Sequence, residues 1–517
     1  MSKSAEPDRS SPARKLQEAA GATRRVCPVG VDLGTSSAKV ATPDAGGAPR
    51  AISSAGGDPW FHSGVFVDAT DDPLFGELAE EEGLRQPSGY IPNVKELRSK
   101  GEKVLGRFFP HELDRMWLCN ELIPACSEQT RESPTHAVLT YPCAEDDKYR
   151  ASIIKAVEDA GIIVVGTVSE STAAIIWAVT KKVVDLQIGD LVILVDIGAG
   201  TTDVSIGRYT SDGTLEIIAA DGLKGHGGRK LVAEIVALVL ERASKQIGTK
   251  VEPDKLAPDA KHHLFASSQK ALHSLGQRDS ARVQVIAAGK SNAIEVKTVD
   301  LKRILDEFMK LVAELITRVM LAAKVDPASV RQVLCTGGPT RNGLTRESLA
   351  ALTKLPVVSV PEPQSAVAFG ALIHCQALLA ANGALVGGLP AHAVKTTDCT
   401  TKDLSIGVQT RTPGSEPSLV CACIAPSGSP IPFKTEHKFA LERADQSTLR
   451  VVVLQGREGQ QAANCTVLGE ALFHNLPVEL VKTGRIRVQV EISTHNLAVV
   501  TVTDGISGQS KTLSVKF

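Results

Sequence analysis

The chain has 517 residues, of which 43% are hydrophobic, 22% charged and 4% aromatic, and its formal net charge is -1. This length exceeds one hydrophobic core and predicts about three domains of ordinary globular composition. The balanced charge and the scarcity of aromatic residues argue against nucleic acid as a partner, because nucleic acids are bound through basic surfaces and stacking side chains.

The first 25 residues are polar and lack the apolar stretch of a secretory signal. We expect residues 1–25 to form a disordered tail and, without a targeting signal, the protein to be cytoplasmic. Residues 363–394 contain no charged side chain, but polar residues and the Gly387-Gly388 pair interrupt this apolar run. It therefore predicts a buried core helix, and we expect no membrane partner.

Two strand–turn–strand patterns of similar chemistry lie far apart in the chain. The first covers 29–40 and contains Asp32 before a glycine turn, and the second covers 191–206 and contains Asp196 in the same position. A repeated unit of this kind predicts a duplicated α/β domain in which each half presents one hairpin to a shared cleft.

Other segments have clear helical or strand patterns. Apolar residues at helical spacing predict helices over 146–160, 171–182 and 301–323. From residue 404 onward strand patterns dominate, and the strict alternation at 485–493 followed by 497–503 predicts a hairpin. Several short strands with polar turns indicate a C-terminal β-sandwich.

The two hairpins contain residue types that bind phosphate and a cation. Glycines such as Gly34 and Gly198 let backbone N–H groups approach phosphate oxygens closely. The carboxylates of Asp32 and Asp196 suit hydrated Mg²⁺, because this cation keeps several waters and takes few protein ligands. One such hairpin is also an ordinary Asp-Gly turn. Two in this order, followed by a Gly-Gly turn at 337–338, predict a nucleotide site.

The same residues resemble those of a known family. Residues 195–206 resemble the second phosphate loop of the 70-kilodalton heat-shock (DnaK-type) chaperones, and residues 32–35 resemble the first. Further similarity is found in the helix start at 169–174, the proline-switch segment at 139–150, the adenosine loop at 337–341, and the turns at 424–434 and 455–458. The resemblance covers about residues 28–517 and is thin over 41–133.

The resemblance implies an architecture and a set of ligands. The fold would be an α/β, actin-like, two-lobed ATPase domain over 26–384, then a polar linker over 385–403. A β-sandwich of the substrate-binding type would follow over 404–517, without the family's helical lid. The implied cofactors are ATP or ADP, Mg²⁺ and K⁺. The implied partners are a J-domain co-chaperone, a nucleotide exchange factor and unfolded peptide segments.

The resemblance also implies roles for individual residues. Asp32 and Asp196 would hold Mg²⁺ through water, and Lys95 would orient the attacking water. Glu170 would couple the γ-phosphate to closure of the lobes, and Pro142 and Arg150 would relay that change to the β-domain. The remaining implied nucleotide-binding residues are Gly34, Thr35, Ser36, Gly198, Ala199, Gly200, Thr201, Thr202, Gly227, Gly228, Lys270, Ser274, Gly337, Gly338 and Arg341, with Thr201 also in a catalytic role.

Two of these roles have simpler alternatives. Lys95 is also one lysine among many that would be solvated at the surface. Glu170, at a predicted helix start, also suits the positive end of a helix dipole without any catalytic role.

Several positions depart from the family pattern. The departures are Ala199 in a glycine-rich loop, Lys270 as the sole charged residue of the adenine clamp at 267–271, Pro339 in a serine position, Gln364 in an acidic position and Arg229-Lys230 in place of two acids. These changes predict weakened nucleotide binding and slower turnover. The polar linker predicts weak coupling between domains, because it would bury little apolar area.

Three functions fit these observations. The leading hypothesis is an ATP-binding chaperone with slow hydrolysis and weak binding of unfolded peptide segments. The first alternative is a non-hydrolysing regulatory co-chaperone or scaffold subunit. A small-molecule kinase of the same superfamily also uses two such hairpins, but we find no motif for its catalytic base.

Overall fold

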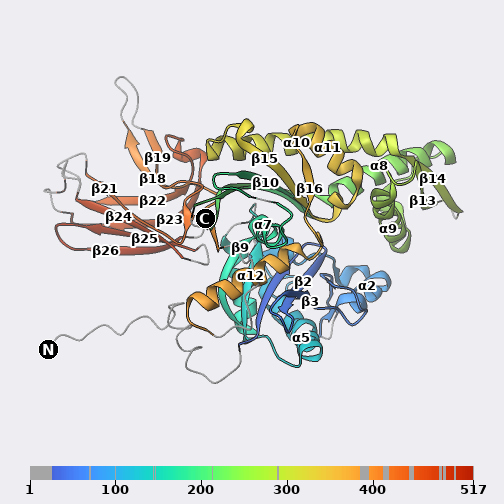
Figure 1. Ribbon diagram of the computed structural model, residues 1–517, viewed down its shortest axis with the longest axis horizontal. Coiled ribbons are helices and arrows are strands. Elements are labelled where there is room, and N and C mark those ends of the chain that lie inside the picture. Colours follow the sequence, from blue (N-terminus) through green and yellow to red (C-terminus); the bar gives the residue numbers. More distant parts are fainter. Residues whose placement is uncertain are drawn as a thin grey trace.

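The computed structural model describes residues 26–515 except for 69–71, 99, 144, 146, 185, 212–213, 288–289, 385–394, 411–417, 442–447, 477–479, 481–484 and 494–496. Two α/β lobes lie beside an all-β region, which is drawn in orange and red in Figure 1. The tail predicted over 1–25 lies outside the described residues.

The first lobe is built on a mixed sheet in the order β3-β2-β1-β8-β9, and β4 also pairs with β2. β1 runs antiparallel to β2 and parallel to β8. Every residue of β1 is buried, as its apolar sequence predicts. The strands are β1 (Pro28–Leu33), β2 (Ser37–Pro43), β3 (Pro49–Ala51), β4 (Phe61–His62), β8 (His136–Tyr141) and β9 (Ile163–Ser169).

Helices and a small sheet complete this lobe. Side chains from its helices and from one face of the sheet share one buried core. The three short strands of the small sheet pair in the order β6-β5-β7. These elements are α2 (Gly76–Arg85), α3 (Lys95–Arg98), α4 (Pro110–Trp117), α5 (Ile123–Thr130), α6 (Asp147–Asp159), β5 (Val65–Phe66), β6 (Leu74–Phe75) and β7 (Tyr90–Ile91).

The second lobe is built on a seven-stranded sheet in the order β16-β15-β10-β11-β12-β17-β20. Its central hairpin, β10 with β11, repeats the antiparallel β1–β2 pair of the first lobe. The strands are β10 (Leu191–Ile197), β11 (Thr201–Tyr209), β12 (Thr214–Lys224), β15 (Val330–Thr336), β16 (Val357–Ser359), β17 (Lys395–Cys399) and β20 (Pro430–Ile431). The predicted duplication of hairpins is therefore confirmed.

Four helices and a two-stranded hairpin pack on the second lobe. The long amphipathic helix predicted over 301–323 is confirmed as α10, whose buried face contributes to the lobe's core. The elements are α8 (Gly228–Ile247), α9 (Pro258–Ser274), α10 (Thr298–Ala323), α11 (Gly343–Thr353), β13 (Ser280–Ala287) and β14 (Lys290–Lys297).

Helices α7 (Glu170–Thr180) and α12 (Ala366–Ala381) lie between the two large sheets (Figure 1). Their side chains share one buried core with Val138 of the first sheet and Leu194 of the second. α12 falls in the uncharged segment, so the predicted core helix is confirmed. Among the helices that the structure describes, none is long and apolar enough to cross a membrane.

The C-terminal region is a β-sandwich, as predicted. Two four-stranded sheets, in the orders β19-β18-β22-β23 and β21-β24-β25-β26, enclose a common apolar core. The alternating segment forms the hairpin of β24 and β25. The strands are β18 (Leu404–Thr410), β19 (Ser418–Ala425), β21 (Phe433–Phe439), β22 (Leu449–Gln455), β23 (Thr466–Phe473), β24 (Ile486–Ile492), β25 (Ala498–Asp504) and β26 (Ser510–Val515).

The segment expected to be a polar, weakly docked linker contains strand β17. This strand pairs in parallel with β12 of the second lobe and antiparallel with β20, so the lobe's sheet continues into the sandwich region. Asp398 and Cys399 are buried there. Main-chain pairing and a hydrogen-bonded buried polar group hold this segment without much apolar area. Weak coupling between the domains stays a prediction, but small buried apolar area is no longer sufficient reason for it.

Candidate functional site

A cleft of about 840 Å³ lies between the two lobes. Both hairpin turns, the start of α8 and one face of α9 line it. Of the residues predicted for the site, the cleft is lined by Asp32, Gly34, Thr35, Ser36, Lys95, Glu170, Asp196, Gly198, Ala199, Thr201, Gly228, Gly337 and Gly338. The structure therefore brings most of them together from segments far apart in the chain.

Three turns meet at the closed end of the cleft. The Gly228 amide donates a hydrogen bond to the Gly198 carbonyl at 2.8 Å, and the Arg229 amide donates one to the Ala199 carbonyl at 2.9 Å. Gly337 has φ of +91°, and a Cβ there would lie 2.1 Å from the carbonyl oxygen of Ile197, so no other residue fits. This packing leaves the backbone of the turns facing the cleft.

Ala199 does not weaken the second turn in the way that we expected. Positive φ would penalise alanine, but neither Ala199 nor its glycine neighbours in this turn have positive φ. The extra methyl group is therefore compatible with the observed backbone. Gly200 lies against the other lobe, since a Cβ there would be 3.0 Å from Thr35 Oγ1.

Four carboxylates gather in or beside the cleft: Asp32, Glu170, Asp196 and Asp203. Burial raises the pKa of Asp196, and the nearby charges of Glu170, Asp203 and Asp32 raise it further. Burial, with Glu170 as the second cause, also raises the pKa of Asp203 to about 7. A buried group of carboxylates that lacks enough positive charge fits a divalent cation held mainly by oxygen atoms, so Asp32 and Asp196 are suitable for hydrated Mg²⁺.

Asp203 was absent from the predicted site. It is 1% exposed and accepts a hydrogen bond from the Cys143 amide at 2.7 Å. The sequence contained a signal for it, because Asp203 follows Thr201 by two positions on a strand and therefore faces the same side.

Lys95 and Glu170 form a buried ion pair with a distance of 2.7 Å between Nζ and Oε1. Burial lowers the pKa of Lys95, but the charges of Glu170, Tyr149 and Asp32 and the hydrogen bond to Glu170 together outweigh that effect, so the net change is upward and the ammonium stays charged. With 4% of its side chain exposed, Lys95 is not the solvated surface lysine of the alternative interpretation. Glu170 occupies the first turn of α7, so it also suits the helix dipole.

Comparisons with known proteins agree with this geometry. A family model described as Hsp70 protein matches residues 99–517. The chain belongs to the Hsp70 family. It is also 26% identical over 520 residues to the chaperone protein HscA of Pectobacterium carotovorum subsp. carotovorum (strain PC1), an alignment that covers 94% of this chain and 78% of that protein. Hsp70 proteins are chaperones that bind ATP or ADP with Mg²⁺.

The segment of α9 that the sequence predicted as an adenine clamp differs from that prediction in which helix face meets the cleft. Lys270 is exposed and lies outside the lining, and the Ser274 hydroxyl donates to the Ala271 carbonyl of its own helix. In the last turns of α9 the residues that line the cleft are instead Gln269, Leu272 and His273, and nearer its start the lining residues are Pro258, Lys261, His262, Phe265 and Ala266. The phase is set by residues of α9 that pack inward on the lobe, namely Ala260, Leu264, Ser268 and Ala271.

Arg341 is exposed and does not line the cleft. It lies near His273, because the pKa of His273 is lowered first by burial and then by the Arg341 charge.

Two of the residues predicted to contact the nucleotide, Thr202 and Gly227, have packing roles instead. Thr202 is fully buried and donates to the His226 carbonyl at 2.6 Å, and Gly227 packs against the turn at 198–199.

Arg229 stands where the family has an acid, and it spans the cleft. Its guanidinium lies 3.3 Å from Glu96 Oε1 and donates to the Thr35 carbonyl at 3.3 Å, both in the other lobe. Instead of simply weakening the site, this replacement adds a polar link that favours closed lobes. A partly exposed ion pair of this kind contributes on the order of 1 kcal/mol or less.

The two predicted relay residues, Pro142 and Arg150, do not line the cleft. Pro142 is buried and precedes Cys143, whose amide binds Asp203. Arg150 is 2% exposed, and its guanidinium lies over the ring of Tyr141 at 4.9 Å. The Tyr141 hydroxyl in turn lies 3.5 Å from Asp398 of β17.

Asp398 also connects β17 to the cleft through hydrogen bonds to the start of α7. Its carboxylate accepts hydrogen bonds from the Ser169 amide at 3.1 Å and from Thr172 Oγ1 at 3.0 Å. Ser169 is the N-cap of α7, and the next residue is Glu170. The strand between the domains is therefore one residue away from the carboxylate that pairs with Lys95.

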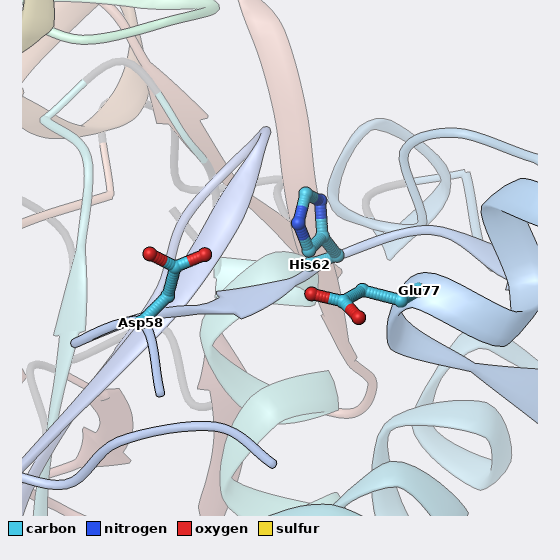
Figure 2. A group of neighbouring side chains, drawn as sticks. All are labelled: Asp58, His62 and Glu77. Atoms are coloured by element: carbon cyan, nitrogen blue, oxygen red, sulfur yellow. The ribbon is translucent and has the colours of Figure 1, made fainter. Parts of the chain in front are cut away.

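A second group of polar side chains includes His62, which also lines the cleft. Figure 2 shows Asp58, His62 and Glu77, whose oxygen and nitrogen atoms approach within 4.8 Å of one another. His62 Nδ1 also lies 3.1 Å from Glu80, and this hydrogen bond is the main cause of the raised pKa of His62. The contact joins β4 to α2 and so stabilises the wall of the cleft.

Proposed function

We propose that this Hsp70 protein is a slow ATPase whose nucleotide state controls its hold on unfolded peptide segments. The observation that carries this proposal is the connection through α7, where Glu170 pairs with Lys95 in the cleft while the preceding amide binds Asp398 of β17. A nucleotide that moves Glu170 would also move the N-terminus of α7. The Ser169 amide and the Thr172 hydroxyl would then move relative to Asp398, their hydrogen-bond acceptor on β17.

In the proposed site, phosphates lie against the backbone of the turns at 34–36 and 198–201. Asp32 and Asp196 would hold hydrated Mg²⁺, which neutralises phosphate charge. Lys95, positioned by Glu170, would orient the attacking water. His273 and Leu272 would contact the base. The proposed units are a nucleotide-binding domain over 26–384, a connecting segment over 385–403 and a peptide-binding sandwich over 404–517.

The proposed partners follow from this cycle. A J-domain co-chaperone would stimulate the slow turnover, and an exchange factor would open the lobes that Arg229 helps to close. The second candidate function is a regulatory or scaffold subunit without turnover. It is favoured by the predicted adenine-clamp segment at 267–271, where the residue that lines the cleft is the uncharged Gln269 and not Lys270.

The rate at which a bound peptide dissociates tests the coupling between the nucleotide state and peptide binding. We expect a fluorescent, unfolded apolar peptide to dissociate faster when ATP and Mg²⁺ are added than when ADP is added, by roughly tenfold for a coupling energy of about 1.4 kcal/mol. The readout is the dissociation rate from the full chain measured by anisotropy. Equal rates with ATP and ADP, in a protein that binds both nucleotides, would support the scaffold function instead.

A further inference from the structure

Lys39 is a charged residue of the cleft that neither the motifs nor the proposed mechanism uses. It lies on β2 directly opposite Asp32 of β1 in the antiparallel register, so both side chains share one face of the sheet. Its neighbours Ala38 and Val40 point into the core, whereas the Lys39 side chain lines the cleft and is 18% exposed.

The Lys39 ammonium is held at the first phosphate turn. Nζ donates a hydrogen bond to the Ser37 carbonyl at 3.0 Å and lies 3.5 Å from Asp32 Oδ2. It also lies over the turn itself, since a Cβ on Gly34 would be 3.1 Å from Nζ. An ammonium has three N–H donors, so these two oxygen partners leave one donor for an anion in the cleft.

The charges around the cleft show why a further cation is useful there. The charge of Lys95 is already paired with Glu170 at 2.7 Å, while Asp32 and Asp196 add negative charge at the same end. Nucleotide phosphates would add more. Charges of one sign that gather in a poorly solvated site are costly unless cations lie close to them.

We propose that the Lys39 ammonium serves as a built-in monovalent cation of the nucleotide site, and that it makes nucleotide binding independent of K⁺. A carboxylate oxygen and a main-chain carbonyl oxygen are ligands that a K⁺ ion also accepts, and here both already contact Nζ. This inference rests on the proposed nucleotide site and differs from the family expectation that K⁺ takes part.

Binding of a fluorescent ADP analogue to the full chain with Mg²⁺ tests this assignment. Affinities are compared at equal ionic strength in potassium chloride, sodium chloride and tetramethylammonium chloride. We expect the wild type to bind with the same affinity, within about twofold, in all three salts. Lys39→Met should bind roughly tenfold or more weakly in tetramethylammonium chloride, because a hydrogen bond to a charged group is lost. Potassium chloride should restore much of that affinity.

Controls separate this role from a structural one. Lys310→Met, at an exposed position of α10, should bind as the wild type does in each salt, and Lys39→Arg should stay independent of K⁺. Melting temperatures without nucleotide show whether each variant folds, and Lys39→Gln replaces Lys39→Met if the latter does not.

Three results would overturn the proposal: a K⁺-dependent wild type, a Lys39→Met variant with unchanged affinity, or a loss of affinity that K⁺ does not restore. A wild type that binds no nucleotide in any salt would instead show that the proposed nucleotide site is wrong.

Discussion

Lys95→Met will destabilise the first lobe by about 3–5 kcal/mol, because it leaves the buried carboxylate of Glu170 without its cation. The pair is 2.7 Å apart and the side chains are only 4% and 10% exposed, so water compensates poorly for the lost ammonium. The same change should abolish measurable ATP turnover, since the proposed water-orienting group is removed.

The double variant Lys95→Met with Glu170→Gln separates the effect of Lys95 on stability from its effect on ATP turnover. Removing both charges leaves no unpaired ion, so we expect most of the lost stability to return while turnover stays absent. The measurements are the midpoint of the first urea-induced transition and the rate of single-turnover hydrolysis. A double variant as unstable as Lys95→Met alone would mean that the ion pair is not what stabilises this region, and turnover in either variant would remove Lys95 from the mechanism.

Asp398→Ala should release the strand that joins the lobes to the sandwich. The change removes the acceptor for the Ser169 amide, the Thr172 hydroxyl and the Cys399 amide. Each buried donor left without a partner costs about 1–3 kcal/mol. A total loss of about 3 kcal/mol would raise the undocked population by about a hundredfold, at 1.4 kcal/mol per factor of ten.

Limited proteolysis with trypsin measures this release. Lys395 lies in the part of β17 that pairs with β12, so cleavage after Lys395 requires the strand to leave that partner. We expect Asp398→Ala to be cut much faster than the wild type, and Asp398→Asn to fall between them because it keeps one acceptor oxygen. Asp306→Ala, at an exposed position of α10, is the matched control. Unchanged cleavage at Lys395 in Asp398→Ala would show that Asp398 does not hold the strand.

The sequence was most informative where function depends on the local conformation of the backbone. The turns after Asp32 and Asp196 were recognisable because glycine and aspartate determine a hairpin within a few residues. The alternation at 485–493 likewise predicted the β24–β25 hairpin. Asp203 could have been found by the same two-residue alternation, since it lies on a strand two positions from Thr201, which was already predicted to face the site. Lys39 reaches the site through the pairing of β2 with β1, which places it opposite Asp32.

Features that depend on tertiary packing were not predictable. The phase of α9 follows from how Leu264, Ser268 and Ala271 pack on the lobe, so a one-residue error exchanged Lys270 for Gln269. Strand β17 has no apolar pattern of its own. Its structure comes from the free edge of β12, which is formed by residues far earlier in the chain, and from the buried acceptor of Asp398.

Single-turnover hydrolysis of ATP by the purified full chain, with Mg²⁺ and alongside Asp196→Ala, tests the central claim most directly. The structure predicts that the wild type binds ATP and hydrolyses it slowly, and that Asp196→Ala eliminates the turnover, because one of the two carboxylates placed to hold Mg²⁺ is lost. Turnover that survives in Asp196→Ala, or a wild type that binds ATP without hydrolysing it, would contradict the account of this cleft as a working ATPase site.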